Sequence, residues 1–129
     1  MINHTWLMTT TELTRLRYGM LSTPEEWAAK GKNAADASME GLQELERRHN
    51  CHRNTTENTV YFVFLAGILV LVSAPTLATQ VWIVSFAVAR LGYTYSYLAG
   101  NVSLRGLFMS LSLLPMYGMA SYILVSLFV

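Results

Sequence analysis

A set of arginines, tyrosines and polar side chains could hold a small anionic ligand. After Glu57 the chain contains only two charged side chains, Arg90 and Arg105, and all 8 carboxylates lie at or before Glu57. Arg53 lies four residues before Glu57, so a helix would place both on one face. Arginine binds carboxylates through paired hydrogen bonds. The full set is Arg53, Asn54, Glu57, Arg90, Tyr93, Tyr97 and Arg105.

A pocket lined by this set would be cationic and would contain one carboxylate. It would suit a small ligand with more than one carboxylate and one amine, and glutathione is such a ligand. A guanidinium near the ligand's sulfur would lower the thiol pKa and favour the reactive thiolate. Taken alone, Arg53 and Glu57 favour an interfacial ion pair, and Arg105 an ordinary loop arginine. Arg90 favours a functional role, because ionisable groups inside membrane spans usually face polar cavities.

The charge-poor second half predicts the elements that must position these residues. Apolar stretches predict membrane-spanning helices at about 58–73, 79–98 and 104–128. A span needs about 20 residues, so the first must extend a polar helix that begins near Met39. Pro75 predicts a tight connection, and Pro115 a kink within the third span. The predicted fold is all-α, an integral membrane helical bundle, with a polar segment at 1–57 and a transmembrane domain at 58–129.

The polar first segment contains its own helix signals. Thr23 can cap a helix, Pro24 suits the first helical position, and Glu25 and Glu26 complement the positive end of the helix dipole. Residues 31–38 predict a loop. A weak helical face could be formed by Leu13, Leu16, Met20 and Leu21. Ion pairs at helical spacing are predicted among Glu40, Glu44, Arg47 and Arg48.

Basic residues predict the orientation in the membrane. Arg47, Arg48 and Arg53 precede the first span, which places that side in the cytoplasm. Three spans would then place the loop at 99–103 and Arg105 on the same side. The candidate ligand set would lie in the cytoplasmic half of the spans.

Other classes of site and partner are not favoured. Cys51 is the only cysteine, so no intrachain disulfide can form. His49, Cys51 and His52 are potential metal ligands, but no fourth ligand lies close by, and we expect no metal site. No basic patch with interleaved aromatic residues argues for nucleic acid.

Several motifs resemble one known membrane family. Glu46-Arg47, His52-Arg53-Asn54 and the following Glu57 resemble the signature that opens the second helix of the MAPEG family. The family's third helix, the arginine that follows it and a proline of the fourth helix have similar counterparts here. These are Arg90-Leu91-Gly92-Tyr93-Thr94, Tyr97-Leu98, Arg105 and Pro115. Similar to the end of the first helix and the next loop are Arg15-Leu16-Arg17 and Thr23-Pro24-Glu25-Glu26. The resemblance covers one domain at about 13–129.

This resemblance implies a glutathione site between adjacent subunits of a homotrimer in the endoplasmic reticulum or another intracellular membrane. A hydrophobic co-substrate would enter from the lipid bilayer, and the site would face the cytosol. Arg105 is the residue implied for stabilising the glutathione thiolate. The residues implied for holding glutathione are Arg15, Arg53, Asn54, Glu57, Arg90, Tyr93 and Tyr97.

Departures from the family's prostaglandin branch favour a general glutathione transferase or peroxidase. Asn50 and Gly106 stand where that branch has arginine and serine, and Met109 where it has tyrosine. Tyr93 replaces its histidine and resembles the leukotriene-forming branch. A prostaglandin E synthase-like isomerase is the alternative expectation.

The front of the chain departs most from the family. The family's first membrane helix needs about 20 apolar residues ending near Arg15. The residues before Arg15 include Asn3, His4, Glu12 and five threonines, so we expect that they do not span. The sequence therefore predicts three spans where the family has four. A second alternative is a truncated, non-catalytic membrane partner of full-length homologues.

Overall fold

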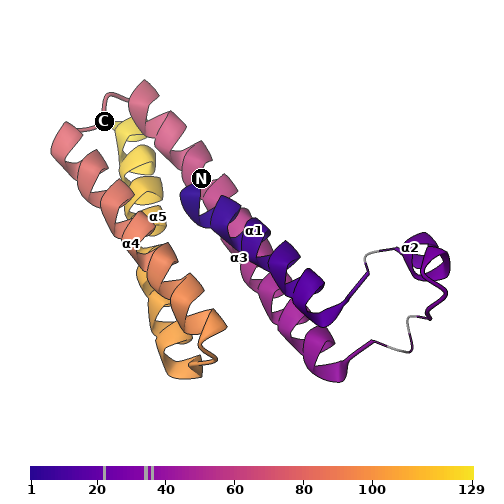
Figure 1. Ribbon diagram of the computed structural model, residues 1–129. Helices are drawn as coiled ribbons and strands as arrows, with labels where there is room; N and C mark the ends of the chain where they lie inside the picture. Colours follow the sequence, from indigo (N-terminus) through magenta and orange to yellow (C-terminus); the bar gives the residue numbers. More distant parts are fainter. Residues whose placement is uncertain (22, 34, 36) are drawn as a thin grey trace. The chain divides into compact units, whose positions relative to one another are not determined.

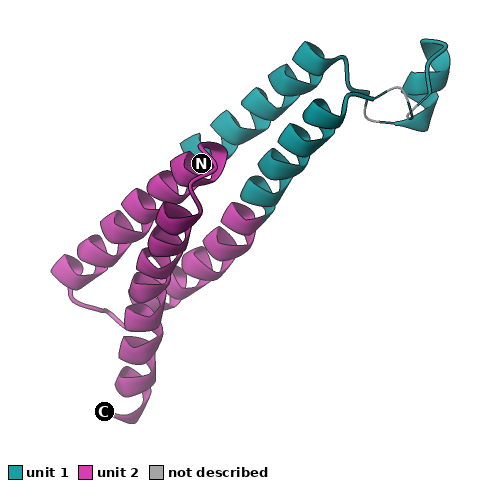
Figure 2. Cartoon of the chain, turned by 90° about the horizontal axis from the view of Figure 1, so that it is seen from below, with its two compact units in different colours: residues 1–53 teal, residues 54–129 magenta. Residues whose placement is uncertain are grey.

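In the residues that it describes, 1–21, 23–33, 35 and 37–129, the computed structural model contains five helices and no strand. The predicted all-α class is therefore confirmed. The chain divides into two compact units, residues 1–53 and residues 54–129 (Figure 2). The helices labelled in Figure 1 are α1 (Ile2–Tyr18), α2 (Pro24–Ala29), α3 (Met39–Leu71), α4 (Thr76–Leu98) and α5 (Val102–Phe128).

In the first unit, α1 lies antiparallel to the first part of α3. The Tyr18 hydroxyl donates to Glu40 Oε1 at 3.3 Å, and at the other end the rings of His4 and His52 meet with centroids 5.6 Å apart. Helix α1 ends at Gly19, whose φ of 60° is left-handed, a common helix stop. The expected helical face including Met20 and Leu21 is therefore wrong, because both follow this stop.

Three threonines of α1 bond their hydroxyl groups within the helix. Thr10, Thr11 and Thr14 each donate to the carbonyl four residues earlier, at 2.8, 2.6 and 2.8 Å. Such local bonds supply the partner that a hydroxyl needs away from water.

The predicted helix start at Thr23 and the predicted ion pairs in α3 are confirmed. The Thr23 hydroxyl accepts a hydrogen bond from the Glu26 backbone N–H at 3.3 Å, with Pro24 in the first turn. The pKa of the Glu25 carboxyl is lowered, chiefly by its own backbone N–H and then by Thr23. In α3, Glu44 pairs with Arg47 at 3.4 Å and with Arg48 at 2.9 Å. The polar helix from Met39 and the first apolar stretch form one helix of 33 residues, as expected.

In the second unit, the rest of α3 packs with an antiparallel hairpin of α4 and α5. Leu69 from α3 is buried with Met119 and Ile123 from α5. The rings of Phe62 and Phe86 stack α3 on α4, with centroids 4.0 Å apart. The side chain of Asn101 caps α5 by accepting from the Leu104 N–H at 3.0 Å.

Two of the described helices, α3 and α5, are long and apolar enough to cross a membrane. Helix α4 has 23 residues, but Gln80, Arg90 and its hydroxyl-bearing side chains lower its hydropathy. The structure thus identifies two candidate spans among the described residues, where the sequence predicts three. The span over α4 stays a prediction.

Two reciprocal contacts between glycine and an aromatic ring fix the α4–α5 hairpin. Gly92 of α4 faces the ring of Phe108, and Gly118 of α5 faces Trp82. A methyl group added at Gly118 would lie 2.7 Å from Trp82 Nε1, and one added at Gly92 would overlap the Phe108 ring. Each glycine therefore creates the room that the opposite ring occupies.

Replacing Gly92 with alanine is expected to destabilise the protein by about 1–3 kcal/mol, because the added methyl group overpacks the hairpin. The measurement is unfolding of the detergent-solubilised protein. The matched control is Gly67→Ala in α3, where no atom lies within 4 Å of the added methyl group. There the better helix propensity of alanine should dominate, by about 0.5–1 kcal/mol. Equal effects at both positions would contradict the packing argument.

Candidate functional site

Arg90 lies at the centre of the polar residues in the second unit. Its side chain projects from α4, and the residue is only 3% exposed. One guanidinium nitrogen, Nη2, donates to Asn54 Oδ1 at 2.8 Å and to Thr55 Oγ1 at 3.2 Å, both on α3. The other, Nη1, donates to Ser112 Oγ on α5 at 3.3 Å. Arg90 therefore links all three helices of this unit through one charged group.

Two softer contacts complete the surroundings of Arg90. Nη1 also lies 3.6 Å from the Met109 sulfur, and the guanidinium carbon stands 4.4 Å from the centre of the Tyr93 ring. The negative face of an aromatic ring attracts a cation. Both contacts help to offset the cost of burying this charge.

A row of side chains continues from Arg90 toward the beginning of α5. The rings of Tyr93 and Tyr97 are 5.6 Å apart, and the Arg105 guanidinium lies 4.9 Å from the centre of the Tyr97 ring. We call this set the arginine–tyrosine row; its members are Asn54, Arg90, Tyr93, Tyr97 and Arg105. The row has a buried cation at one end and a half-buried cation at the other.

The Arg105 end of the row is suited to a negative group. Arg105 lies in the first turn of α5, which begins after Asn101. A helix N-terminus carries a partial positive charge and favours anions. The positive potentials of the guanidinium and of the helix end therefore add at this position. An anion placed here, such as a thiolate or a carboxylate, would be stabilised by both.

Glu57 does not join the row. Its side chain is exposed, and it makes no ion pair with any residue in the described part of the chain. Asn54 is instead supported by Asn58, whose side-chain nitrogen donates to the Asn54 carbonyl at 2.8 Å. The row therefore contains five of the six predicted site residues that belong to this unit.

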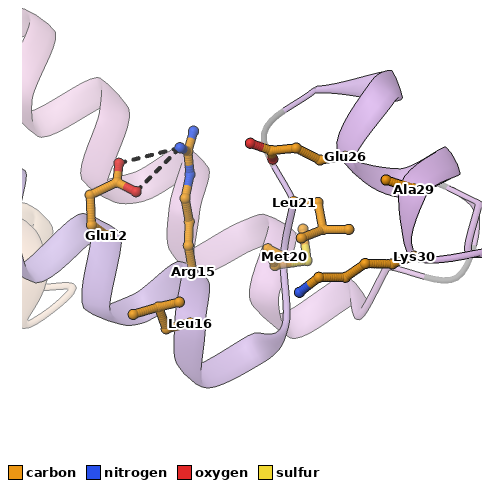
Figure 3. Close-up of a pocket in the computed structure, with 8 residues that line it drawn as sticks. All are labelled: Glu12, Arg15, Leu16, Met20, Leu21, Glu26, Ala29 and Lys30. Atoms are coloured by element: carbon orange, nitrogen blue, oxygen red, sulfur yellow. Dashed lines mark hydrogen bonds and ion pairs between the residues drawn. The ribbon is translucent and has the colours of Figure 1, made fainter.

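Arg15 and Arg53 belong to the first unit. Arg15 pairs with Glu12 at 3.2 Å and lines a hollow of about 380 Å³ between α1 and α2 (Figure 3). Lys30 and Glu26 from α2 also line this hollow. The hollow thus presents cations and carboxylates together. Arg53 does not line the hollow and is exposed on α3.

Sequence reasoning missed two residues that hold Arg90. Thr55 and Ser112 are 1% and 0% exposed, and each accepts a hydrogen bond from Arg90. Ser112 also donates to the Met109 carbonyl at 2.8 Å. For Ser112 the signal available was a small hydroxyl residue inside an apolar helix, a type that often bonds between membrane helices.

The described residues contain no cluster of three or more histidine, cysteine, aspartate or glutamate side chains that could hold a metal ion. The groups of the row are instead suited to an organic anion, because they offer cations and phenol groups.

Comparison with known proteins gives one family. The family model described as the MAPEG family matches residues 2–125. A search of curated proteins finds no match to the chain.

Proposed function

Because the chain belongs to the MAPEG family, a membrane family, we propose that it is a membrane-bound glutathione transferase or peroxidase acting on lipophilic electrophiles. The observation that supports this proposal is the arginine–tyrosine row, which joins a buried and a half-buried arginine through two tyrosines. The row matches glutathione, which carries two carboxylates and a thiol that must become a thiolate.

Each residue of the row has a proposed role. Arg105 stabilises the glutathione thiolate, and Tyr97 holds the Arg105 guanidinium against its ring. Asn54, Tyr93 and Tyr97 contact the bound peptide. Arg90 adds positive potential and fixes Asn54 and Tyr93, to which its own contacts run. From resemblance alone, Arg15, Arg53 and Glu57 are proposed as further glutathione contacts.

The chemical step follows from thiolate formation. The thiol proton leaves to water, and the sulfur lone pair attacks an electrophilic carbon to form a carbon–sulfur bond. The leaving group departs with its electron pair. With a lipophilic hydroperoxide, the thiolate instead attacks the terminal oxygen and breaks the O–O bond, which gives a sulfenic acid and an alkoxide that takes a proton to become the alcohol. The thiol of a second glutathione then attacks the sulfenic acid to form a disulfide with release of water.

The membrane arrangement is also a proposal. We propose that α4 spans together with α3 and α5, that the row lies toward the cytosol, and that the protein forms a homotrimer in an intracellular membrane. Met109 bears on the prostaglandin E synthase-like alternative, because its sulfur contacts Arg90 where that branch carries a tyrosine. The absence of that tyrosine's phenol group favours the general transferase.

Adding glutathione to the purified protein in detergent is expected to produce the ultraviolet absorbance of a thiolate at neutral pH. S-methylglutathione, which has no thiol to ionise, is the control ligand. Conjugation of 1-chloro-2,4-dinitrobenzene should accompany the absorbance. Absence of thiolate and conjugate, with co-purification of a four-helix homologue, would contradict an enzyme and support a non-catalytic partner.

A further inference from the structure

Two asparagines lie one turn apart on α3, and Arg90 of α4 contacts the first of them. Asn58 is 9% exposed. Its Nδ2 donates to the Asn54 backbone carbonyl at 2.8 Å and also lies 3.4 Å from Asn54 Oδ1. Arg90 Nη2 donates to the same Oδ1 at 2.8 Å. Side chains from two helices therefore converge on one oxygen atom of Asn54.

The chemistry of these partners fixes how the Asn54 amide is turned. A guanidinium has donors only, so the Asn54 atom that Arg90 contacts must be the amide oxygen. A backbone carbonyl can only accept, so the Asn58 atom that contacts it must be the amide nitrogen. Because this one nitrogen reaches both the backbone oxygen and the side-chain oxygen of Asn54, it holds that side chain against its own backbone.

The nitrogen of the Asn54 amide is left to serve a ligand. The oxygen and nitrogen of a carboxamide point in different directions, so Nδ2 is directed away from Arg90 and Asn58. Asn54 is half-buried, and no residue in the described part of the chain accepts a hydrogen bond from its Nδ2. A donor away from water needs an acceptor. Asn54 therefore presents N–H groups beside the charge of Arg90, and this combination suits a carboxylate.

We propose that Asn58 is a positioning residue of the glutathione site. Together with Arg90, it holds the Asn54 amide so that the Asn54 N–H groups receive a carboxylate of the bound peptide. Asn58 acts through Asn54, because it is buried and its nitrogen is used by that residue. The identity of the peptide rests on the proposed function, whereas the orientation of the amide rests on these contacts alone.

The test measures binding of S-methylglutathione, which keeps both carboxylates of glutathione and has no thiol to ionise. Titration calorimetry of the full-length protein in detergent gives the dissociation constant. Asn58→Leu should raise this constant about three- to tenfold, as for one lost hydrogen bond. The matched control is Thr59→Val, which removes a hydroxyl from the next residue of α3, outside the row, and should leave the constant unchanged. Circular dichroism checks that both variants fold.

A double-mutant cycle separates positioning from a merely structural role. If Asn58 acts through Asn54, its influence ends once Asn54→Ala has removed the amide. Adding Asn58→Leu to Asn54→Ala should then weaken binding no further. Additive losses in the double variant would overturn the proposal, because they would show that Asn58 affects binding without Asn54.

Replacing Asn54 with aspartate tests which polarity faces the ligand. Asn54→Asp keeps an oxygen for Arg90 but places a carboxylate where the N–H groups were. Binding should be at least about tenfold weaker than in Asn54→Ala, because like charges are brought together. An affinity equal to that of the parent protein, or higher, would show that Asn54 accepts from the ligand and would overturn the proposal.

This proposal and the proposed transferase can fail independently. The expected pattern with S-methylglutathione, with no thiolate formed from glutathione, would contradict only the transferase. Thiolate formation, with an affinity for S-methylglutathione that Asn58→Leu leaves unchanged, would contradict only the role of Asn58.

Discussion

Replacing Arg90 with methionine is expected to lower the free energy of unfolding by about 2–4 kcal/mol, because hydrogen-bond acceptors on two helices would lose their donor inside the protein. Asn54 and Thr55 on α3 and Ser112 on α5 are the acceptors concerned. Arg90→Lys should be intermediate, since one ammonium group retains the charge but lacks the forked geometry that reaches both helices. Unfolding by sodium dodecyl sulfate in mixed micelles measures the loss.

A compensating variant separates lost hydrogen bonds from lost packing. Removing both partners of a buried hydrogen bond costs less than removing one. Adding Thr55→Val and Ser112→Ala to Arg90→Met should therefore recover part of the stability. If Arg90→Met is as stable as the parent protein but forms no glutathione thiolate, Arg90 would be a ligand contact only, contrary to its linking role.

Replacing Arg105 with alanine is expected to reduce the thiolate fraction of bound glutathione at neutral pH by about tenfold or more. A cation within a few ångströms of a thiol lowers its pKa by about 1–3, so its removal should return the thiol pKa toward about 8.5. Titrating thiolate absorbance against pH in the parent and the variant measures this change. The variant should form thiolate only at higher pH, because its thiol needs a lower proton concentration to ionise.

The control variants for Arg105 separate charge from position. Arg105→Lys keeps the charge and should retain much of the thiolate. Tyr97→Phe keeps the ring under the guanidinium, whereas Tyr97→Leu removes it and should raise the thiol pKa. An unchanged titration curve in Arg105→Ala would transfer the role of thiolate stabiliser to another group.

The sequence predicted helix positions well where local chemistry decides them. Thr23 and Pro24 define the beginning of α2, and the chain near Pro75 does connect two long helices. The stop of α1 at Gly19 was missed, because a left-handed glycine ends a helix despite apolar residues on both sides. The number of spans could not be decided either, because Arg90 and the hydroxyl-bearing side chains of α4 lower the hydropathy of this helix.

The candidate site was predicted in part. The spacing of Arg90, Tyr93 and Tyr97 placed them on one helical face, and the structure brings them into contact. The partners of Arg90 on α3 and α5 depend on packing between segments far apart in the chain, which periodicity does not reveal. Met109 was noted only as a departure from a tyrosine, yet its sulfur contacts the buried guanidinium.

The two glycine–ring contacts of the hairpin have a consequence for how the protein is made. They lie roughly 15 Å apart along each helix, at 1.5 Å rise per residue, and each helix supplies one glycine and one ring. If α4 slid by one turn along α5, both rings would meet side chains in place of glycine. During folding, misaligned pairings of α4 and α5 would therefore be rejected at two points simultaneously, and the newly made hairpin would settle into a single alignment.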